Sequence, residues 1–277
     1  MTASDTLEAT ARSRPSAPDP GGVAVALEEI SQTFQRDGRV TRAIDRVDLS
    51  VAPGEFVAVL GPSGCGKSTL LKITAGLIAP STGRVSIGGT AVRGPFTDIG
   101  VVFQSPVLLD WRNILDNVLV QIELRGLPTE AYRARALELL SSVGLEGFAD
   151  RMPRELSGGM RQRAAIVRGL IHDPPLLMMD EPFGALDALT REQMRIDLEK
   201  LWLGRRQTTV FITHGIAEAV ALADRVVVMT PRPGRIDTIL PIDLPRPRDK
   251  AVLASPRFAE YCEAITERFM RHGVIKY

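Results

Sequence analysis

The chain has 277 residues, of which 44% are hydrophobic, so it is long enough to bury a core as one large domain or two small ones. Its formal charge of +1, with Lys and Arg spread along the chain, gives no overall attraction to nucleic acid, and we expect no nucleic-acid partner. No membrane-spanning stretch or secretory signal is evident, and Cys65 and Cys262 have neither metal-ligand nor disulfide spacing, which favours a reducing, cytoplasmic compartment.

The N-terminal part predicts a tail followed by strands. Residues 1–22 are rich in Ala, Ser, Thr and Pro and have little to bury, so we expect a mobile tail. From Val23 the chain becomes β-rich, with apolar runs separated by the polar turns "RDGR" and "APGE". The predicted strands cover residues 23–30, 44–51 and 55–60.

The stretch "GPSGCGKST" at 61–69 predicts a nucleoside triphosphate site. It joins the strand "FVAVL" to the helical pattern "LLKITAGL", and its spacing satisfies the template G-x-x-x-x-G-K-[ST]. Glycines let backbone N–H groups wrap around phosphates, and the helix start adds positive potential. Lys67 is expected to reach the β- and γ-phosphates and Ser68 to bind Mg²⁺, whereas a glycine-rich structural turn is the alternative. The residues expected to contact the nucleotide here are Gly61, Pro62, Ser63, Gly64, Cys65, Gly66, Lys67, Ser68 and Thr69.

Further along, helical and β-rich patterns alternate. Apolar residues recur at helical spacing after about residue 109, which predicts a helical insert over residues 109–165. The runs "PLLMMD", "TTVFIT" and "RVVVMT" then alternate with helical stretches, which indicates parallel strands covered by helices. "SPRFAEYCEAITERFM" predicts a terminal helix. We therefore expect an α/β fold with one nucleotide cassette, since no internal repeat is evident.

Two acidic residues end the strand in "LLMMDEP" at 176–182. Carboxylates at a strand tip lie beside the phosphate loop in open α/β sheets. We expect Asp180 to hold Mg²⁺ through water and Glu181 to orient or deprotonate the attacking water. The alternative is a solvated strand end.

"LSGGMRQR" at 156–163 contains a second helix start suited to an anion. A single nucleotide does not require two such helix starts in one chain. Two copies arranged head to tail would give each nucleotide one of each kind, which predicts a dimer with ATP at its interfaces. The alternative is a Ser N-cap with flexible glycines.

Together these stretches resemble the ATP-binding subunit of an ABC transporter. "GPSGCGKST" resembles Walker A, "LLMMDEP" Walker B and "LSGGMRQR" the family signature, while "VVFQ", "ALD" at 185–187 and "ITH" resemble the Q-loop, D-loop and switch histidine. The resemblance covers about residues 23–230. It implies a P-loop NTPase cassette at 23–240 with a mixed or parallel sheet core, an N-terminal antiparallel β subdomain and an inserted helical subdomain, followed by a C-terminal extension at 241–277.

The resemblance also implies residue roles. Gln104 would meet Mg²⁺ and the lytic water, and His214 would contact the γ-phosphate and hold Glu181 in line. Phe34 would stack on adenine, although it could equally be a core residue. Asp187 would lie at the dimer interface. The residues expected to complete the partner copy's ATP site are Ser157, Gly158 and Gly159, and Gln162 is also expected to bind nucleotide.

Two weaker marks resemble the nitrate, sulfonate and taurine importer branch of this family. They are "SPVLLDWRNILDNVLVQIELRG" at 105–126, with its Trp111 and Arg112, and "MTPRPGRI" at 229–236. This branch implies membrane permease subunits as partners, an extracytoplasmic solute-binding protein as an indirect partner, and a peripheral position on the cytoplasmic face. Trp111 is either a partner contact or a buried anchor of the insert. An exporter and a non-transport ABC ATPase remain alternatives.

Overall fold

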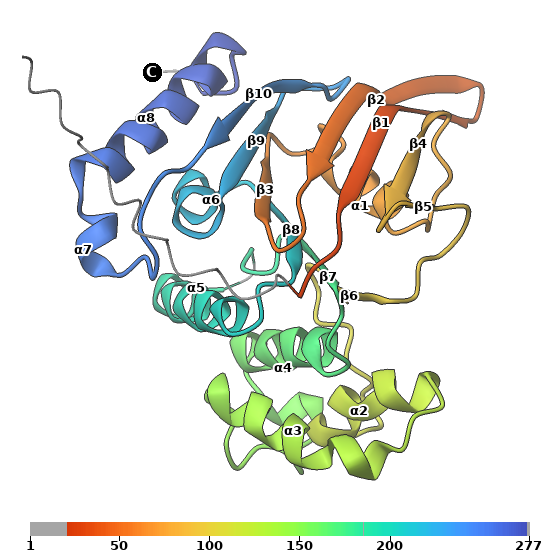
Figure 1. Cartoon of the computed structure of the whole chain (residues 1–277), viewed down its shortest axis with the longest axis vertical. Coiled ribbons are helices and arrows are strands. Elements are labelled where there is room, and N and C mark those ends of the chain that lie inside the picture. The colour runs from red at the N-terminus through yellow and green to blue at the C-terminus, as the bar shows by residue number, and fades with distance from the viewer. Residues whose placement is uncertain (1–20, 185, 276–277) are drawn as a thin grey trace, which may run out of the picture.

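An antiparallel sheet forms the first layer of the fold, because its strands alternate buried and exposed side chains. The computed structural model describes residues 21–184 and 186–275, so the predicted tail at 1–22 lies almost entirely outside the described residues. β1 (Val25–Arg36) pairs with β2 (Arg39–Val51) and β4 (Thr82–Ile87), and β5 (Thr90–Ala91) completes the order β2-β1-β4-β5 (Figure 1). β1 runs six residues beyond its predicted end at residue 30.

A second, six-stranded sheet forms the centre of the molecule. Its order is β10-β9-β3-β8-β7-β6, and all neighbours are parallel except the antiparallel pair β9 and β10. Strands buried on both faces read as continuous apolar runs, as in β3. β8 is also buried throughout, although three of its residues are threonines. The strands are β3 (Phe56–Leu60), β6 (Ile99–Val102), β7 (Leu176–Asp180), β8 (Thr208–Thr213), β9 (Arg225–Met229) and β10 (Ile236–Pro241).

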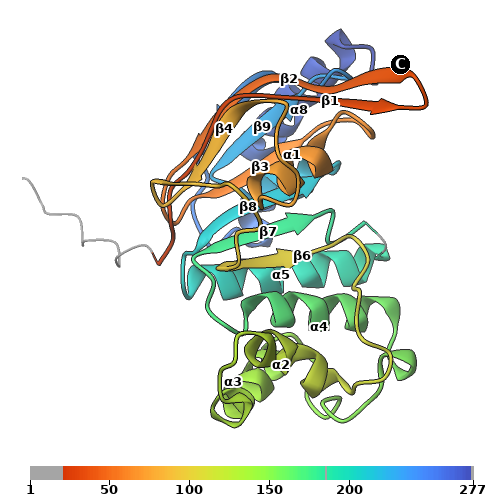
Figure 2. The ribbon, with the colours of Figure 1, turned by 90° about the vertical axis from the view of Figure 1, so that its right-hand side faces the viewer.

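Helices cover both faces of this sheet. α1 (Lys67–Thr74) packs between the two sheets, where its Leu70, Leu71 and Ile73 join one core cluster (Figure 2). A second cluster lies on the opposite face, around the buried Trp202. The helices that contribute to it include α5 (Ala188–Leu203), α6 (Ile216–Leu222) and α8 (Pro256–Arg271). None of the helices within the described ranges is both long and apolar enough to cross a membrane.

The helical insert has a core of its own. α2 (Ile114–Leu124), α3 (Thr129–Ser142) and α4 (Gly158–Leu170), with a 3₁₀ turn at Pro153–Glu155, bury a third apolar cluster. This part lies apart from the antiparallel sheet, at the other end of the molecule (Figure 1). α4 extends past the predicted bound at residue 165, and its Ile166 and Leu170 pack against the central sheet. The predicted fold class is confirmed, with an antiparallel subdomain, a mixed sheet and a helical insert.

A buried arginine docks the C-terminal segment, which contains α7 (Lys250–Leu253) and α8. Arg248 is 1% exposed, and its guanidinium donates to the carbonyl oxygens of Val220 and Ala223, each at 2.7 Å. Burial, aided by the nearby Arg246, lowers the pKa of Arg248 to about 10. These contacts hold the segment against α6, on the side of the sheet opposite α1.

Candidate active site

The phosphate loop joins β3 to α1 through a tight backbone path. Gly66, the N-cap of α1, has φ of 111°, and a Cβ there would lie 2.9 Å from the carbonyl oxygen of Ala43. Only glycine fits both constraints. No side chain caps the helix start, so its N–H groups are free of side-chain acceptors. This cradle fits the phosphates of a nucleotide.

Lys67 places its ammonium group inside the loop. The side chain is 4% exposed, and Nζ donates to the carbonyl oxygens of Gly61 at 2.8 Å and Pro62 at 3.2 Å. Nζ also lies 3.7 Å from Oε1 of Glu181. The positive charge is therefore held between the loop and the end of β7, where a terminal phosphate is expected.

Ser68 and Asp180 form the pair suited to a cation. The Ser68 hydroxyl donates to Oδ1 of Asp180 at 3.0 Å. The pKa of Asp180 is raised overall. Burial raises it most, the hydrogen bond from Ser68 offsets part of this effect, and the negative charge of Glu181 raises it further. A divalent cation would favour the ionised form.

Oxygen ligands of this kind fit Mg²⁺, which usually needs only a few protein ligands beside water and phosphate oxygens. Among the residues that the structure describes, no group of three His, Cys, Asp or Glu could hold a metal by itself. Ser68, Asp180 and Gln104 would therefore hold Mg²⁺ together with a nucleotide.

Three loops converge on Glu181. Its φ of 45° is in the left-handed region, which is strained for a non-glycine residue, and its N–H donates to the Ile212 carbonyl at 2.9 Å. Oε2 lies 3.2 Å from Nδ1 of His214, which follows β8, and 3.5 Å from Nε2 of Gln104, which follows β6. The two side chains orient the carboxylate, an arrangement suited to a general base for water.

Glu181 and Gln104 line a cavity of about 530 Å³, whereas the predicted residues Asp180 and His214 lie outside its lining. Phe34 is 39% exposed on its wall, so the alternative of a core residue does not hold. The predicted residues that line the cavity are Phe34, Ser63, Gly64, Gly66, Lys67, Ser68, Thr69, Gln104 and Glu181. Sequence reasoning missed four more: Arg36, Thr41, Ala43 and Arg232. Arg232 had one signal, its place in "MTPRPGRI".

Other predicted residues of the phosphate loop lie outside this lining. Gly61, Pro62 and Cys65 do not line the cavity. The Cys65 side chain is 1% exposed, and burial raises the pKa of its thiol. A contact of Cys65 with nucleotide would therefore use the backbone.

The signature and D-loop residues lie away from this cavity. Ser157 caps α4 by accepting from the Met160 N–H, and Asp187 caps α5 by accepting from the Thr190 N–H at 3.0 Å. Both caps are exposed, as is Gly158. Ser157, Gly158, Gly159 and Asp187 are absent from the cavity lining. The chain therefore presents these helix starts outward, apart from its own phosphate loop.

Gln162 was expected to contact ATP, but it does not line the cavity. Its side chain is buried, and Nε2 donates to the Phe103 carbonyl at 3.1 Å. Phe103 directly precedes Gln104. Gln162 therefore supports the backbone that carries Gln104, because its amide is already occupied in the protein interior.

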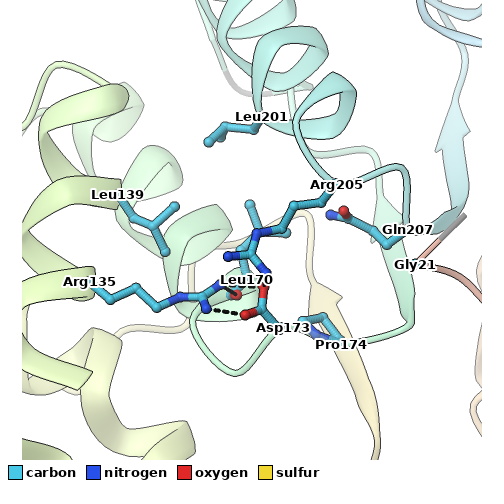
Figure 3. Close-up of a pocket in the computed structure, with 9 residues that line it drawn as sticks. All are labelled: Gly21, Arg135, Leu139, Leu170, Asp173, Pro174, Leu201, Arg205 and Gln207. Atoms are coloured by element: carbon cyan, nitrogen blue, oxygen red, sulfur yellow. Dashed lines mark hydrogen bonds and ion pairs between the residues drawn. The ribbon is translucent and has the colours of Figure 1, made fainter. Parts of the chain in front are cut away.

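A smaller cavity of about 200 Å³ lies between α3, the end of α4 and the turn after α5 (Figure 3). Arg135 from α3 and Arg205 from that turn both form ion pairs with Asp173 there. None of the predicted catalytic or nucleotide-binding residues lines it. The pairs join α3 of the helical insert, through the loop that precedes β7, to the turn that follows α5.

Known proteins share the sequence and fold of this chain. The family profile described as ABC transporter matches residues 44–184. An uncharacterized ABC transporter ATP-binding protein of Methanocaldococcus jannaschii is 48% identical over 243 residues, which cover 88% of this chain and 90% of that protein. A taurine import ATP-binding protein of Burkholderia pseudomallei is 44% identical over 253 residues, covering 89% and 97%.

A solved structure extends the similarity to the fold. It is a dimeric, post-hydrolysis ATP-binding cassette bound to ADP and Pi, with a TM-score of 0.71 and 33% identity. The match covers 79% of this chain and 98% of that one. The range matched by the family profile contains the phosphate loop, Asp180 and Glu181.

Proposed function

The chain belongs to the ABC transporter family and is an ATP hydrolase of that family, and on this premise we propose that it energises import of a small anionic solute through a separate membrane permease. The observation that carries the catalytic part is the convergence of Lys67, Gln104 and His214 on the carboxylate of Glu181 beside the phosphate loop. The proposed solute class, of the nitrate, aliphatic sulfonate or taurine type, is supported by the taurine import names of two relatives.

Each side chain has a task in the proposed hydrolysis. Glu181 accepts a proton from the attacking water, while His214 and Gln104 hold the carboxylate in position. Lys67 neutralises charge on the terminal phosphate from inside the loop. A bound Mg²⁺ would neutralise further charge on the phosphate oxygens. Phe34 provides a ring on the cavity wall for the adenine.

The proposed working unit is a head-to-tail dimer. Ser157 and Gly158, at the N-terminus of α4, are exposed and lie outside the chain's own ATP cavity. Within one copy, therefore, only the N-terminus of α1 faces the expected phosphates. A second copy would supply the N-terminus of its α4, and loss of the γ-phosphate contacts after hydrolysis would let the dimer open. The dimeric state of the solved ATP-binding cassette supports this arrangement.

The proposed permease contact lies at the entry of the helical insert. Val107 is 60% exposed, Trp111 75% and Leu124 77%, so Trp111 is not a buried anchor. Arg112 forms an ion pair with Glu123 within the insert. Exposed aromatic and aliphatic side chains on one segment are typical of protein interfaces. On this proposal the chain is peripheral, on the cytoplasmic face of the membrane.

We expect the Glu181→Gln chain with ATP and Mg²⁺ to sediment as a dimer, because slow hydrolysis preserves the ATP that joins the two copies. Adding Gly158→Asp to the same chain should prevent the dimer. A Cβ at Gly158 meets no atom within 4 Å in the monomer, but the added carboxylate would repel the partner's phosphates. Analytical ultracentrifugation with and without ATP measures the difference. Dimers that persist with Gly158→Asp would contradict the shared site.

Uptake in cells tests the direction of transport and the solute. With Glu181→Gln replacing the native chain, uptake of one of three labelled solutes, taurine, an alkanesulfonate or nitrate, should fall to background, because permease cycling needs ATP hydrolysis. Glu138→Gln, an exposed change on α3, is the matched control. Unchanged uptake of all three with lost efflux of a solute would instead indicate an exporter. No change in either direction would indicate a non-transport ATPase.

A further inference from the structure

The segment 230–235 docks directly on the phosphate loop. It joins β9 to β10, and its Gly234 donates to the Ala43 carbonyl at 3.0 Å and accepts from the Asp45 N–H at 2.9 Å. A Cβ on Gly234 would lie 2.0 Å from the carbonyl oxygen of Cys65. Any side chain at position 234 would clash with the backbone of the phosphate loop, so only glycine allows this close approach. The "PRPG" stretch therefore lies against the phosphate loop, and its Arg232 lines the large cavity.

Contacts within this segment fix its shape. The Thr230 N–H donates to the Arg235 carbonyl at 2.9 Å, and the Thr230 hydroxyl accepts from the Arg235 N–H at 3.1 Å. The Arg235 guanidinium also pairs with Asp45 of β2. The turn that carries Arg232 is thus braced from both sides, so the position of Arg232 beside the phosphate loop is set by the surrounding backbone.

Arg232 extends from this turn to the phosphate loop. Its Nε donates to the Gly64 carbonyl at 3.0 Å, and its side chain lines the cavity with Ser68 and Phe34. One hydrogen bond uses one of five guanidinium N–H donors, which leaves the others for a ligand. The position therefore combines a fixed anchor with free donors.

The charge of Arg232 is not neutralised by the described part of the chain. Arg235, three residues on, pairs with Asp45, but Arg232 has no carboxylate within 4 Å among the described residues. The positive charges of Lys67 and Arg232 both lower the pKa of the Cys65 thiol, although burial, which raises it, has the larger effect. Two cations thus act on the same loop, and a guanidinium matches the geometry of phosphate oxygens.

We propose that Arg232 is a nucleotide-binding residue that contacts the phosphates of ATP or ADP from the side of the loop opposite Glu181. This inference rests on the proposed function, because it needs ATP to occupy the large cavity. It also assigns a task to "MTPRPGRI": Gly234 permits the close approach and Arg232 supplies the charge. The alternative role, a contact to an acidic residue of a second copy, is an outcome of the test.

The test is calorimetric titration of ATP, ADP and adenosine into monomeric protein. We expect Arg232→Gln to weaken ATP and ADP binding roughly five- to tenfold, because a charge-assisted hydrogen bond is lost at an exposed site, and to leave adenosine binding unchanged. Arg232→Lys keeps the charge but not the guanidinium geometry, so it should also weaken binding, by less than Arg232→Gln does. High salt should reduce the difference between the wild type and Arg232→Gln. Arg84→Gln, an exposed arginine on β4, removes the same charge away from the cavity and is the control.

The outcomes separate this inference from the proposed function. If the unaltered chain binds no ATP, the proposed function fails. If it binds ATP and Arg232→Gln binds equally well, only the role of Arg232 fails, and an effect confined to dimer formation would assign the arginine to the partner contact instead. Equal losses for ATP and adenosine would mean that the residue only shapes the loop, which also overturns the proposal.

Discussion

Replacing Glu181 with Gln is expected to slow ATP hydrolysis by roughly 10²-fold or more, because general-base catalysis contributes about that much. The amide has the shape of the carboxylate but cannot accept the water's proton. ATP binding should be retained, since the change removes a negative charge that lies 3.7 Å from Nζ of Lys67 and near the expected γ-phosphate. Phosphate release in single-turnover experiments measures the chemical step, and titration measures the affinity.

The control for this experiment is Glu138→Gln, which makes the same chemical change at an exposed position of α3. It should leave both hydrolysis and affinity at the wild-type level. Near-normal turnover by Glu181→Gln would reject the assignment of Glu181 as the base. The strained backbone at Glu181 makes thermal unfolding a useful companion measurement, because unchanged stability shows that the loss lies in chemistry.

The second large effect is expected at Lys67. Lys67→Ala should weaken ATP binding by roughly 10²-fold or more, because contacts of a charged donor are worth about 1.5–3 kcal/mol each and Lys67 is expected to meet two phosphates. The change also leaves the carbonyl oxygens of Gly61 and Pro62 without their donor. Isothermal titration with ATP gives the affinity directly.

Lys72→Ala is the matched control for Lys67→Ala. Lys72 lies on the same helix, α1, but is exposed and does not line the ATP cavity. It should bind ATP with nearly unchanged affinity. If Lys67→Ala binds ATP as well as Lys72→Ala does, the phosphate loop does not hold the nucleotide as proposed.

The local motifs of this protein could be predicted because their chemistry depends on neighbours in the chain. The glycines at 61–66 and the lysine after them lie within one strand, turn and helix, and the two acids follow the apolar run at 176–179 at the end of one strand. The structure places both motifs in that context. The fold class followed from the same alternation of patterns. Even the early strands were located, although β1 extends to Arg36 because pairing with β2 continues along the hairpin.

What lies between these motifs could not be predicted in the same way. The environment of Trp111 and Phe34 depends on which elements pack beside them, and apolar side chains suit a core and an exposed cavity wall alike. The structure exposes both. Gln162 shows the reverse case, since this polar residue of the signature is buried and donates to the Phe103 carbonyl. Burial is a property of the packed molecule.

Local sequence is enough to specify the phosphate loop, the pair of strand-end carboxylates and the second helix start of this chain. Which of these groups lie close together depends on the packing of the whole molecule. The sheet order β3-β8-β7-β6 brings His214, Glu181 and Gln104 together from loops that are far apart in the chain. The same packing brings Arg232 to Gly64. The physical reason is that local spacing sets strands, turns and helices, whereas contacts across the sheet depend on how buried faces pair, which no short stretch specifies.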